Sequence, residues 1–222
     1  SDQTFSEKLV ECSLMQLTHL RKTFKIDGPL LMYVGNLEKY QGIDLLLNSF
    51  QMALASAPTA HLVIIGGTSI DIEKYRQKAQ QLAIHQNIHF TGPRPISHLG
   101  DYLEQADILV SPRTQGNNTP MKLYSYLDSG KALLATDLPT HTQVLNSRVA
   151  WLAQPQPGEF SQGILTLIER RDLRQQLGHE AQALVKQQHT YEAFSNKLAS
   201  LYDWLQIELL GDANAPHLSS SY

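Results

Sequence analysis

The sequence predicts an α/β fold in which helices cover both faces of a doubly wound parallel sheet. Short apolar runs alternate with segments of helical periodicity along most of the 222-residue chain. The runs are continuous and lack in/out alternation, which is typical of parallel strands buried on both faces. Several of them end directly at glycine, where the chain can turn sharply into the next helix. Together these patterns predict a Rossmann-like sheet.

Each strand is identified by its aliphatic residues and by the breaker that bounds it. The first strand follows the break Asp27-Gly28-Pro29 and stops at Gly35. The second stops at Gly66-Gly67 and the third at Gly92-Pro93. The expected strands lie at residues 30–34, 61–65, 88–91, 108–111, 132–136 and 150–153.

Helices are expected where apolar residues recur every three or four positions. The segment at residues 42–55 shows this stripe clearly, at Ile43, Leu46, Leu47 and Phe50. Ser97 is expected to cap the N-terminus of the helix that it begins. The expected helices lie at residues 5–22, 42–55, 70–84, 97–105, 121–128, 139–146, 157–170, 173–188 and 191–210.

Composition and charge limit the classes of function. The net charge of −3 and the pI near 6.3 argue against a nucleic-acid-binding surface, which is usually basic. Cys12 is the only cysteine, so the chain forms no internal disulfide and no cysteine metal cluster. No apolar run is long enough for a membrane span, and no signal peptide is recognisable. We expect a cytoplasmic protein without a transmembrane segment, and peripheral membrane contact is left open.

The most informative connection follows the fourth strand and opens onto a helix N-terminus. Such a loop offers backbone N–H groups and the positive end of a helix dipole, which suit an anion such as a diphosphate. It also lies at the carboxyl end of the sheet, where ligands of doubly wound folds bind. We therefore expect it to hold part of a ligand. Its polar and ordering residues are Arg113, Gln115, Asn117, Asn118, Thr119 and Pro120.

Two cations near this loop each allow two interpretations. Arg113 follows the strand directly. Its guanidinium either binds a phosphate or carboxylate group through paired hydrogen bonds, or forms a surface salt bridge. Lys122 sits in the first turn of the next helix, where a cation opposes the helix dipole. It therefore either meets an anion or is a solvated surface lysine.

Motifs of several other site classes are absent. The sequence contains no P-loop, no G-x-G-x-x-G fingerprint and no G-x-S-x-G elbow, and Ser129-Gly130-Lys131 reads as a helix C-terminus. No Asp-x-Asp pair is present, so we expect no metal site and no cofactor. His85 and His89 are interpreted as surface histidines rather than metal ligands. His141 is interpreted as a polar residue at a helix start, with ligand contact as the alternative.

Several segments, in this order, resemble the C-terminal half of glycosyltransferase family four. They are GNLEKYQGIDLLLNSF, LVIIGG, NIHFTGPRP, YLEQADILVSPR and NTPMKLYSYLDSGKALLATDLPTHTQVL. The resemblance covers roughly residues 29–205. It implies the GT-B fold, in which two Rossmann-like domains face each other across a cleft.

The resemblance also implies how the two domains divide the work. The C-terminal domain binds a nucleotide-sugar, here a UDP-, GDP- or ADP-sugar, without a metal ion, and the other domain holds the acceptor and usually a catalytic histidine. We therefore expect no catalytic residue in this chain. We also expect this chain to be a piece of a longer protein, without the acceptor domain. On this basis residues 1–28 are a linking helix, 29–210 the donor-binding domain and 211–222 a disordered tail.

The expected donor-binding residues follow the strand ends and the loop. They are Gly35, Asn36, Lys39, Gly66, Gly92, Arg94, Arg113, Asn117, Asn118, Thr119, Pro120, Lys122 and Ser125.

Four of the family's customary donor contacts are replaced here by neutral polar residues. Asn36 and Gln41 stand where the family has an arginine and a lysine on the diphosphate, and Asn117 and Ser125 stand where it has two glutamates. Losing two charge-assisted bonds weakens binding on the order of a hundredfold. Cations that could restore part of it are Lys39, Arg94, Arg113 and Lys122.

Three functions follow from these observations. The first is the donor half of a retaining glycosyltransferase. The second is a degenerate, non-catalytic module that binds a protein or glycan partner, because the donor contacts are replaced. The third is a nucleotide-sugar epimerase, which shares the GT-B fold, although the segment 120–145 favours the transferase branch.

Overall fold

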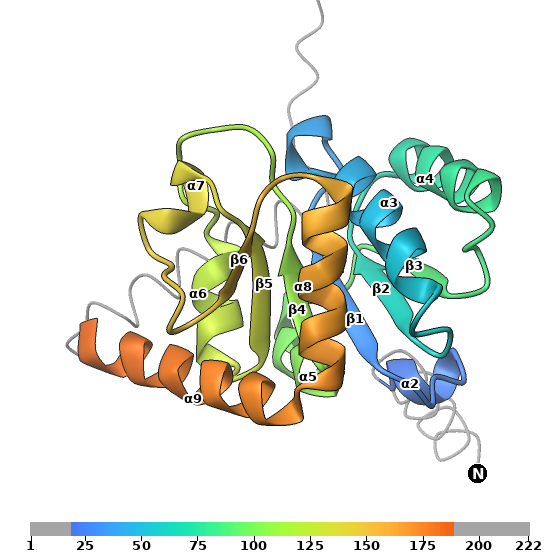
Figure 1. The fold of residues 1–222 in the computed structure, drawn as a ribbon. Helices are drawn as coiled ribbons and strands as arrows, with labels where there is room; N and C mark the ends of the chain where they lie inside the picture. The colour runs from blue at the N-terminus through green and yellow to red at the C-terminus, as the bar shows by residue number, and fades with distance from the viewer. Residues whose placement is uncertain (1–18, 189–222) are drawn as a thin grey trace, which may run out of the picture.

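A single parallel sheet forms the centre of the domain (Figure 1). The computed structural model describes residues 19–188; the helix expected at 191–210, the tail at 211–222 and most of the helix expected at 5–22 lie outside the described residues. The strand order is β3-β2-β1-β4-β5-β6, and every neighbouring pair is parallel. The doubly wound sheet expected from the sequence is thus confirmed. Its strands are β1 (Leu30–Val34), β2 (His61–Ile65), β3 (Ile88–Gly92), β4 (Ile108–Ser111), β5 (Ala132–Thr136) and β6 (Trp151–Ala153).

The topological switch point lies between β1 and β4. The chain adds β2 and β3 outward on one side of β1, then returns to add β4, β5 and β6 on the other side. β1 pairs with both neighbours, Leu31 lying opposite Leu62 in β2 and opposite Ile108 in β4. At such a point the loops after the two adjacent strands diverge to opposite faces, which opens a crevice at the carboxyl ends.

Helices cover both faces of the sheet (Figure 1). The helical elements are α2 (Leu20–Thr23), η1 (Lys39–Gln41), α3 (Ile43–Leu54), α4 (Ser69–Gln81), η2 (Ile96–His98), α5 (Leu99–Gln105), α6 (Lys122–Asp128), α7 (Pro139–Thr142), α8 (Pro157–Glu169) and α9 (Arg171–Gln188), of which η1 and η2 are 3-10 turns.

Alternate residues of each strand point into two separate apolar cores. In β1, Leu31 and Tyr33 join the core beneath α3, α4 and α8, where Phe160 is fully buried. Met32 and Val34 join the core beneath α5, α6 and α9. Because both faces are buried, the strands need no polar alternation, which explains the continuous apolar runs of the sequence.

Some helix boundaries differ from the sequence-based expectation. The prediction that Ser97 caps a helix is wrong, because a 3-10 turn begins at Ile96 directly after Pro95 and Ser97 lies within it. The N-cap position of α5 is His98, which makes no side-chain cap hydrogen bond. At α4, in contrast, the Thr68 hydroxyl accepts a hydrogen bond from the Asp71 N–H and caps the helix that begins at Ser69. The helix expected at 139–146 ends at Thr142 as α7.

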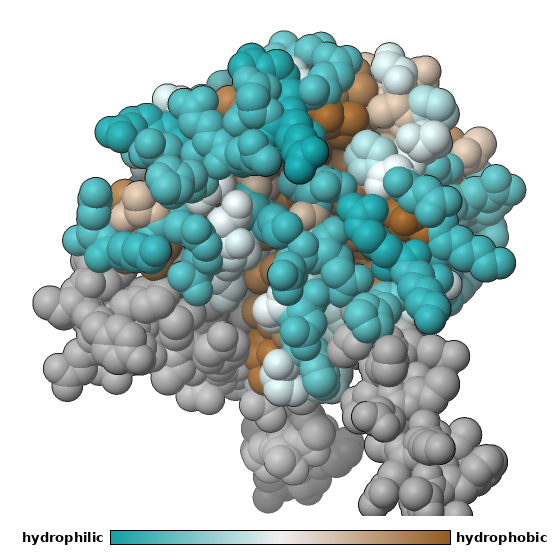
Figure 2. Space-filling view, turned by 90° about the horizontal axis from the view of Figure 1, so that it is seen from below, coloured by the Kyte–Doolittle hydropathy of each residue, from teal (hydrophilic) through white to brown (hydrophobic). Residues whose placement is uncertain are grey.

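The lower end of the domain in Figure 1, where the strands begin, is held by one charged network. The Arg21 guanidinium donates to the Asp107 carboxylate at 2.7 Å and to the Gly28 carbonyl at 2.9 Å. Asp107 also accepts from the Leu30 N–H, so α2 is tied to the starts of β1 and β4. Seen from below, the described residues that are visible are mostly hydrophilic, with apolar residues between them (Figure 2). None of the described helices is long and apolar enough to cross a membrane.

Candidate functional site

The loops after β1 and β4 meet at the carboxyl end of the sheet. The Thr114 N–H donates to the Tyr40 carbonyl at 3.0 Å, which joins the two loops directly. Gly42 has a φ of +77°, and a Cβ on it would lie 1.9 Å from the Pro112 carbonyl oxygen. Only glycine permits both this conformation and this approach. The two loops at the switch point are therefore fixed against each other.

Asn36 shapes the loop after β1. Its carbonyl accepts from the Tyr33 hydroxyl at 2.6 Å, and its side-chain amide donates to the Tyr40 hydroxyl at 3.2 Å. Its side-chain oxygen accepts from the Glu38 N–H at 3.1 Å. Asn36, which the family resemblance aligns with an arginine, thus has a structural role in its own loop, which the sequence did not reveal.

Lys122 is a buried cation at this crevice. Its side chain is 1% exposed, and Nζ lies 4.0 Å from the centroid of the Tyr33 ring. Nζ is also 3.1 Å from where a Cβ on Gly35 would lie, which places it directly behind the end of β1. The interpretation as a solvated lysine is wrong, because helix α6 packs its first turn against the sheet. A cation over an aromatic face is stabilised by the ring's quadrupole.

Arg113 folds over its own loop. Its guanidinium carbon lies 5.0 Å from the centroid of the Tyr40 ring, and Nε donates to the Gln115 carbonyl at 2.9 Å. Of the ion pairs between described residues, none involves Arg113, so the surface salt bridge is not formed. Gly116, with a φ of +103°, leaves the space that the guanidinium fills. Arg113 therefore orders the loop from within.

His141 is fully buried and joins the ends of β4 and β5. Nδ1 lies 2.9 Å from the Thr136 carbonyl, which can only accept, so Nδ1 carries the proton. Nε2 then accepts from the Ser111 hydroxyl at 2.8 Å. Burial lowers the pKa of His141 to about 4, against a smaller raising effect of the Thr136 backbone hydrogen bond. The expectation of a polar residue at a helix start is confirmed, because His141 lies in the first turn of α7. Its burial and its bonds to Ser111 and Thr136 give it a structural role.

Other expected site residues lie away from the β1–β4 crevice. Gly66 donates to the Gly92 carbonyl at 3.0 Å, which ties the ends of β2 and β3 together. Arg94 follows β3 and lies near Tyr102, whose pKa burial raises and Arg94 lowers by a smaller amount. Lys39 is exposed on η1.

Ser125 faces a groove between two helices. It is 8% exposed and lines a hollow of about 370 Å³ between α5 and α6, together with Leu99, Glu104 and Asp128. The hydroxyl is short and neutral, unlike the glutamate that the family resemblance implies at this position. The sequence alone did not locate this groove.

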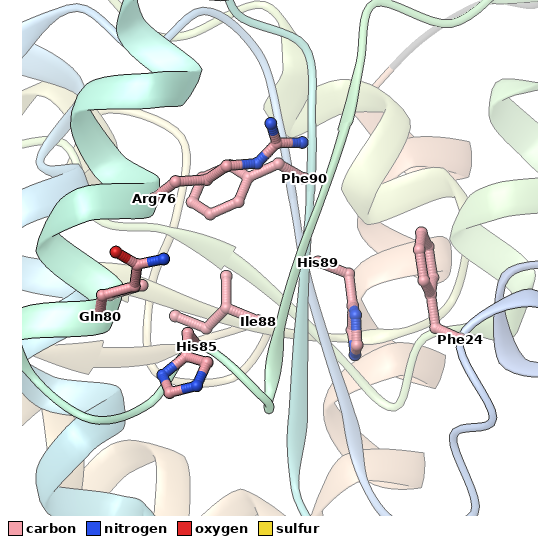
Figure 3. A pocket seen from close by; sticks show the side chains of 8 residues that line it. Phe24, Arg76, Gln80, His85, Ile88, His89 and Phe90 are labelled. Atoms are coloured by element: carbon pink, nitrogen blue, oxygen red, sulfur yellow. The ribbon is translucent and has the colours of Figure 1, made fainter.

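A separate cavity of about 350 Å³ lies along β3, at the edge of the sheet. Figure 3 shows Arg76 beside Phe90 on one side of the strand and His89 facing Phe24 on the other. The Nδ1 atom of His61 lies 2.9 Å from Nε2 of His89, so His89 is packed and bonded rather than a surface residue. In the described part of the chain, no three histidine, cysteine or acidic side chains are grouped to hold a metal ion.

Sequence reasoning missed the aromatic and α7 residues of the site. Tyr33 and Tyr40 support Lys122 and Arg113, and Thr140 and Gln143 contact the loop after β4. The spacing of Thr140 and Gln143 places both on one side of a helical turn, which is the signal that could have identified them.

Comparison with known proteins gives the family. The family model for group 1 glycosyl transferases matches residues 18–184. Phosphatidyl-myo-inositol mannosyltransferase of Mycobacterium tuberculosis is 24% identical over 184 residues, which cover 80% of this chain and 44% of that protein. The chain spans about half the length of the curated relatives it matches.

Solved structures show the same fold. Anabaena HepE in complex with UDP superposes with a TM-score of 0.72 at 15% identity, over 85% of this chain and 52% of that one. The C-terminal domain of the group 1 glycosyl transferase LpcC from Francisella tularensis gives 0.66 at 20% identity, over 77% and 91%. The fold is that of a GT-B glycosyltransferase domain, and the chain belongs to the group 1 glycosyl transferase family.

Proposed function

We propose that this chain is the donor-binding half of a retaining, metal-independent glycosyltransferase. The observation that carries the proposal is the topological switch point, where the loop at residues 113–120 leads into α6 and the buried cation of Lys122. Membership in the group 1 family supports a sugar donor, and the HepE neighbour in complex with UDP supports a uridine nucleotide. The mannosyltransferase relative supports transfer of a hexose.

The donor diphosphate would bind between the two loops. Lys122 supplies positive charge from a site of low dielectric, where Coulomb attraction is stronger than in water. Among the described residues, none accepts a hydrogen bond from the backbone N–H groups of residues 115–119, so these groups can donate to phosphate oxygens. Lys122 is better placed for this role than exposed Lys39, than Arg94 beyond β3, or than Arg113, which is bonded to its own loop.

Transfer needs an acceptor and a second domain. We place both in the part of the relatives that this chain does not cover, and the whole enzyme in the cytoplasm. The chain by itself is then expected to bind donor without transferring sugar. Turnover by the purified chain would contradict this division.

Calorimetric titration with UDP, GDP and ADP tests the binding function. We expect one nucleotide to bind, and Lys122→Met to weaken it about tenfold or more, because a charge-assisted interaction is lost. Lys186→Met, at an exposed position of α9, is the matched control and leaves affinity unchanged. Lys122→Arg keeps the charge and separates the loss of charge from any loss of folding.

Failure to bind any of the three nucleotides at millimolar concentration would contradict the proposal. It would favour the second candidate, a degenerate module for a protein or glycan partner, which the neutral residues Asn36, Gln41, Asn117 and Ser125 motivate. Conversion of a UDP-sugar to its epimer by the chain would instead identify the third candidate, an epimerase.

A further inference from the structure

The loop after β4 is held by its carbonyl oxygens. The Thr136 hydroxyl donates to the Arg113 carbonyl at 2.6 Å. The Thr140 hydroxyl donates to the Asn118 carbonyl at 2.7 Å. The Gln143 side-chain amide donates to the Asn117 carbonyl at 2.7 Å, and its oxygen lies 3.5 Å from the Thr119 hydroxyl. Three carbonyls of one exposed loop are thus bonded from one side, by groups at the end of β5 and on α7.

The N–H groups of the same loop have no such partners. The Thr114 N–H is bonded to the Tyr40 carbonyl, whereas the N–H groups of residues 115–119 reach no acceptor in the described part of the chain. A loop with bonded carbonyls and open N–H groups has the polarity that an anion requires. Thr140 on α7 and Gln143 at its end bond the loop carbonyls and leave the loop N–H groups open. Helix α7 lies beside the loop at the upper end of the sheet (Figure 1).

α7 is itself fixed from below by His141. This side chain is 0% exposed and bonds to Ser111 at the end of β4 and to Thr136 at the end of β5. Thr140 is equally buried, so its hydroxyl has little freedom to turn away from Asn118. Gln143, in contrast, is exposed and reaches the loop from the end of α7. The position of α7 is therefore transmitted to the loop by short contacts.

We infer that Thr140, His141 and Gln143, together called the α7 brace, are positioning residues that hold the donor loop ready for the diphosphate. Thr140 and Gln143 hold the loop carbonyls, and His141 holds α7 to the sheet. The inference rests on the proposed donor function. A loop ordered before binding loses less conformational entropy when the nucleotide arrives, which raises affinity.

The test combines loop order with nucleotide affinity. The double variant Thr140→Val, Gln143→Glu removes both donors and changes the size of neither side chain. Amide heteronuclear NOE values without nucleotide are expected to fall for residues 115–119, and UDP affinity to fall about tenfold. Thr140→Ser keeps the hydroxyl and is expected to retain most of the affinity. Thr166→Val, which removes the hydroxyl of a half-buried residue on α8, is the matched control and is expected to change neither readout.

Loop order is measured without nucleotide, so this inference can fail separately from the donor function. A double variant with an ordered loop and a UDP affinity within about twofold of the parent chain would overturn it. The inference would also be overturned if, in both the double variant and Thr166→Val, UDP affinity fell in proportion to the thermal unfolding temperature. If the parent chain binds no nucleotide, the donor function fails. The α7 brace is then tested by the heteronuclear NOE values of residues 115–119, and unchanged values in the double variant would overturn it.

Discussion

Two sites with partly or fully buried histidines, one at the carboxyl end of the sheet and one at its β3 edge, are similar in chemistry and differ in the elements that they join. At the carboxyl end, His141 bonds to the ends of β4 and β5 beneath the donor loop. At the β3 edge, His61 bonds to His89, and the Phe24 ring stacks on His89 with centroids 4.4 Å apart. Burial lowers the pKa of both His89 and His141 to about 4, with His61 adding to the shift at His89.

The comparison teaches that a shifted pKa does not by itself locate a ligand site. Both shifts have burial as their main cause, so both report packing. What separates the clusters is position. His141 lies under a loop at the topological switch point, whereas His89 fixes Phe24, next to α2, to the edge strand beside the Arg76 cavity. Function is inferred from the neighbours of the histidine and from its place in the topology.

Acidification is expected to give the largest effect, because it acts on both clusters at once. The folded pKa values of about 4 lie below the ordinary histidine value of 6.5, so the unfolded chain binds protons first as the pH falls. The free energy of unfolding should therefore decrease from about pH 6.5 down to about pH 4 and then level off for these groups. Urea denaturation across this range measures it.

Two variants apportion this pH dependence. His89→Gln should flatten part of the slope, whereas His85→Gln, at an exposed position, should leave it unchanged. Equal slopes for His89→Gln and the parent chain would show that the edge cluster does not contribute to acid sensitivity.

Gly42→Ala is expected to give the next largest effect, and only at the crevice. Its Cβ would overlap the Pro112 carbonyl in a backbone conformation that alanine disfavours, at a cost of about 3 kcal/mol. Gly100→Ala, in α5, has open space around its Cβ and should instead stabilise the domain by roughly 0.5 kcal/mol. Chemical denaturation of both variants checks the pair, and similar ΔG values for the two would contradict the close approach of the loops.

His141→Leu is expected to destabilise the domain by about 2 kcal/mol. The substitution leaves the buried Ser111 hydroxyl and Thr136 carbonyl without the imidazole, and buried unsatisfied groups carry a desolvation cost. His85→Leu, at an exposed position, should change the free energy of unfolding by less than about 0.5 kcal/mol. Equal values for the two variants would show that His141 is not needed to join β4 and β5.

The smallest effect is expected for the pair at the β3 edge. A double-mutant cycle with His61→Leu and His89→Leu should give a coupling free energy of about 1 kcal/mol, as for one partly exposed hydrogen bond. Additive losses would mean that the two imidazoles stabilise the edge independently. The cycle is measured near pH 8, where both rings are neutral.

Much of the fold could be predicted because its elements have local causes. Continuous apolar runs placed the strands, and glycines at their ends marked the turns, as Gly35 and Gly92 show. The error at Ser97 has a local cause as well, since Pro95 led into a 3-10 turn before the helix could begin. The polar loop at residues 113–120 was located correctly at the end of a central strand.

The neighbours of the site residues could not be predicted, because they come from segments far apart in the chain. The sequence leaves open whether Lys122 meets an anion or is solvated, and only the packing of α6 places its ammonium over Tyr33. His89 looks like a surface histidine until β2 brings His61 within 2.9 Å.

The sequence by itself determined the class of fold, the order of its elements and the family, because periodicity, breakers and motif order are local properties of the chain. Tertiary structure decided which polar groups are bonded and which remain open. The α7 brace bonds the carbonyls of Asn117 and Asn118, and Thr136 at the end of β5 bonds the carbonyl of Arg113. No pattern in the sequence predicts these contacts. The reason is physical. These hydrogen bonds join residues that are 22 to 26 positions apart, so they form only when the packing of the elements brings the residues together.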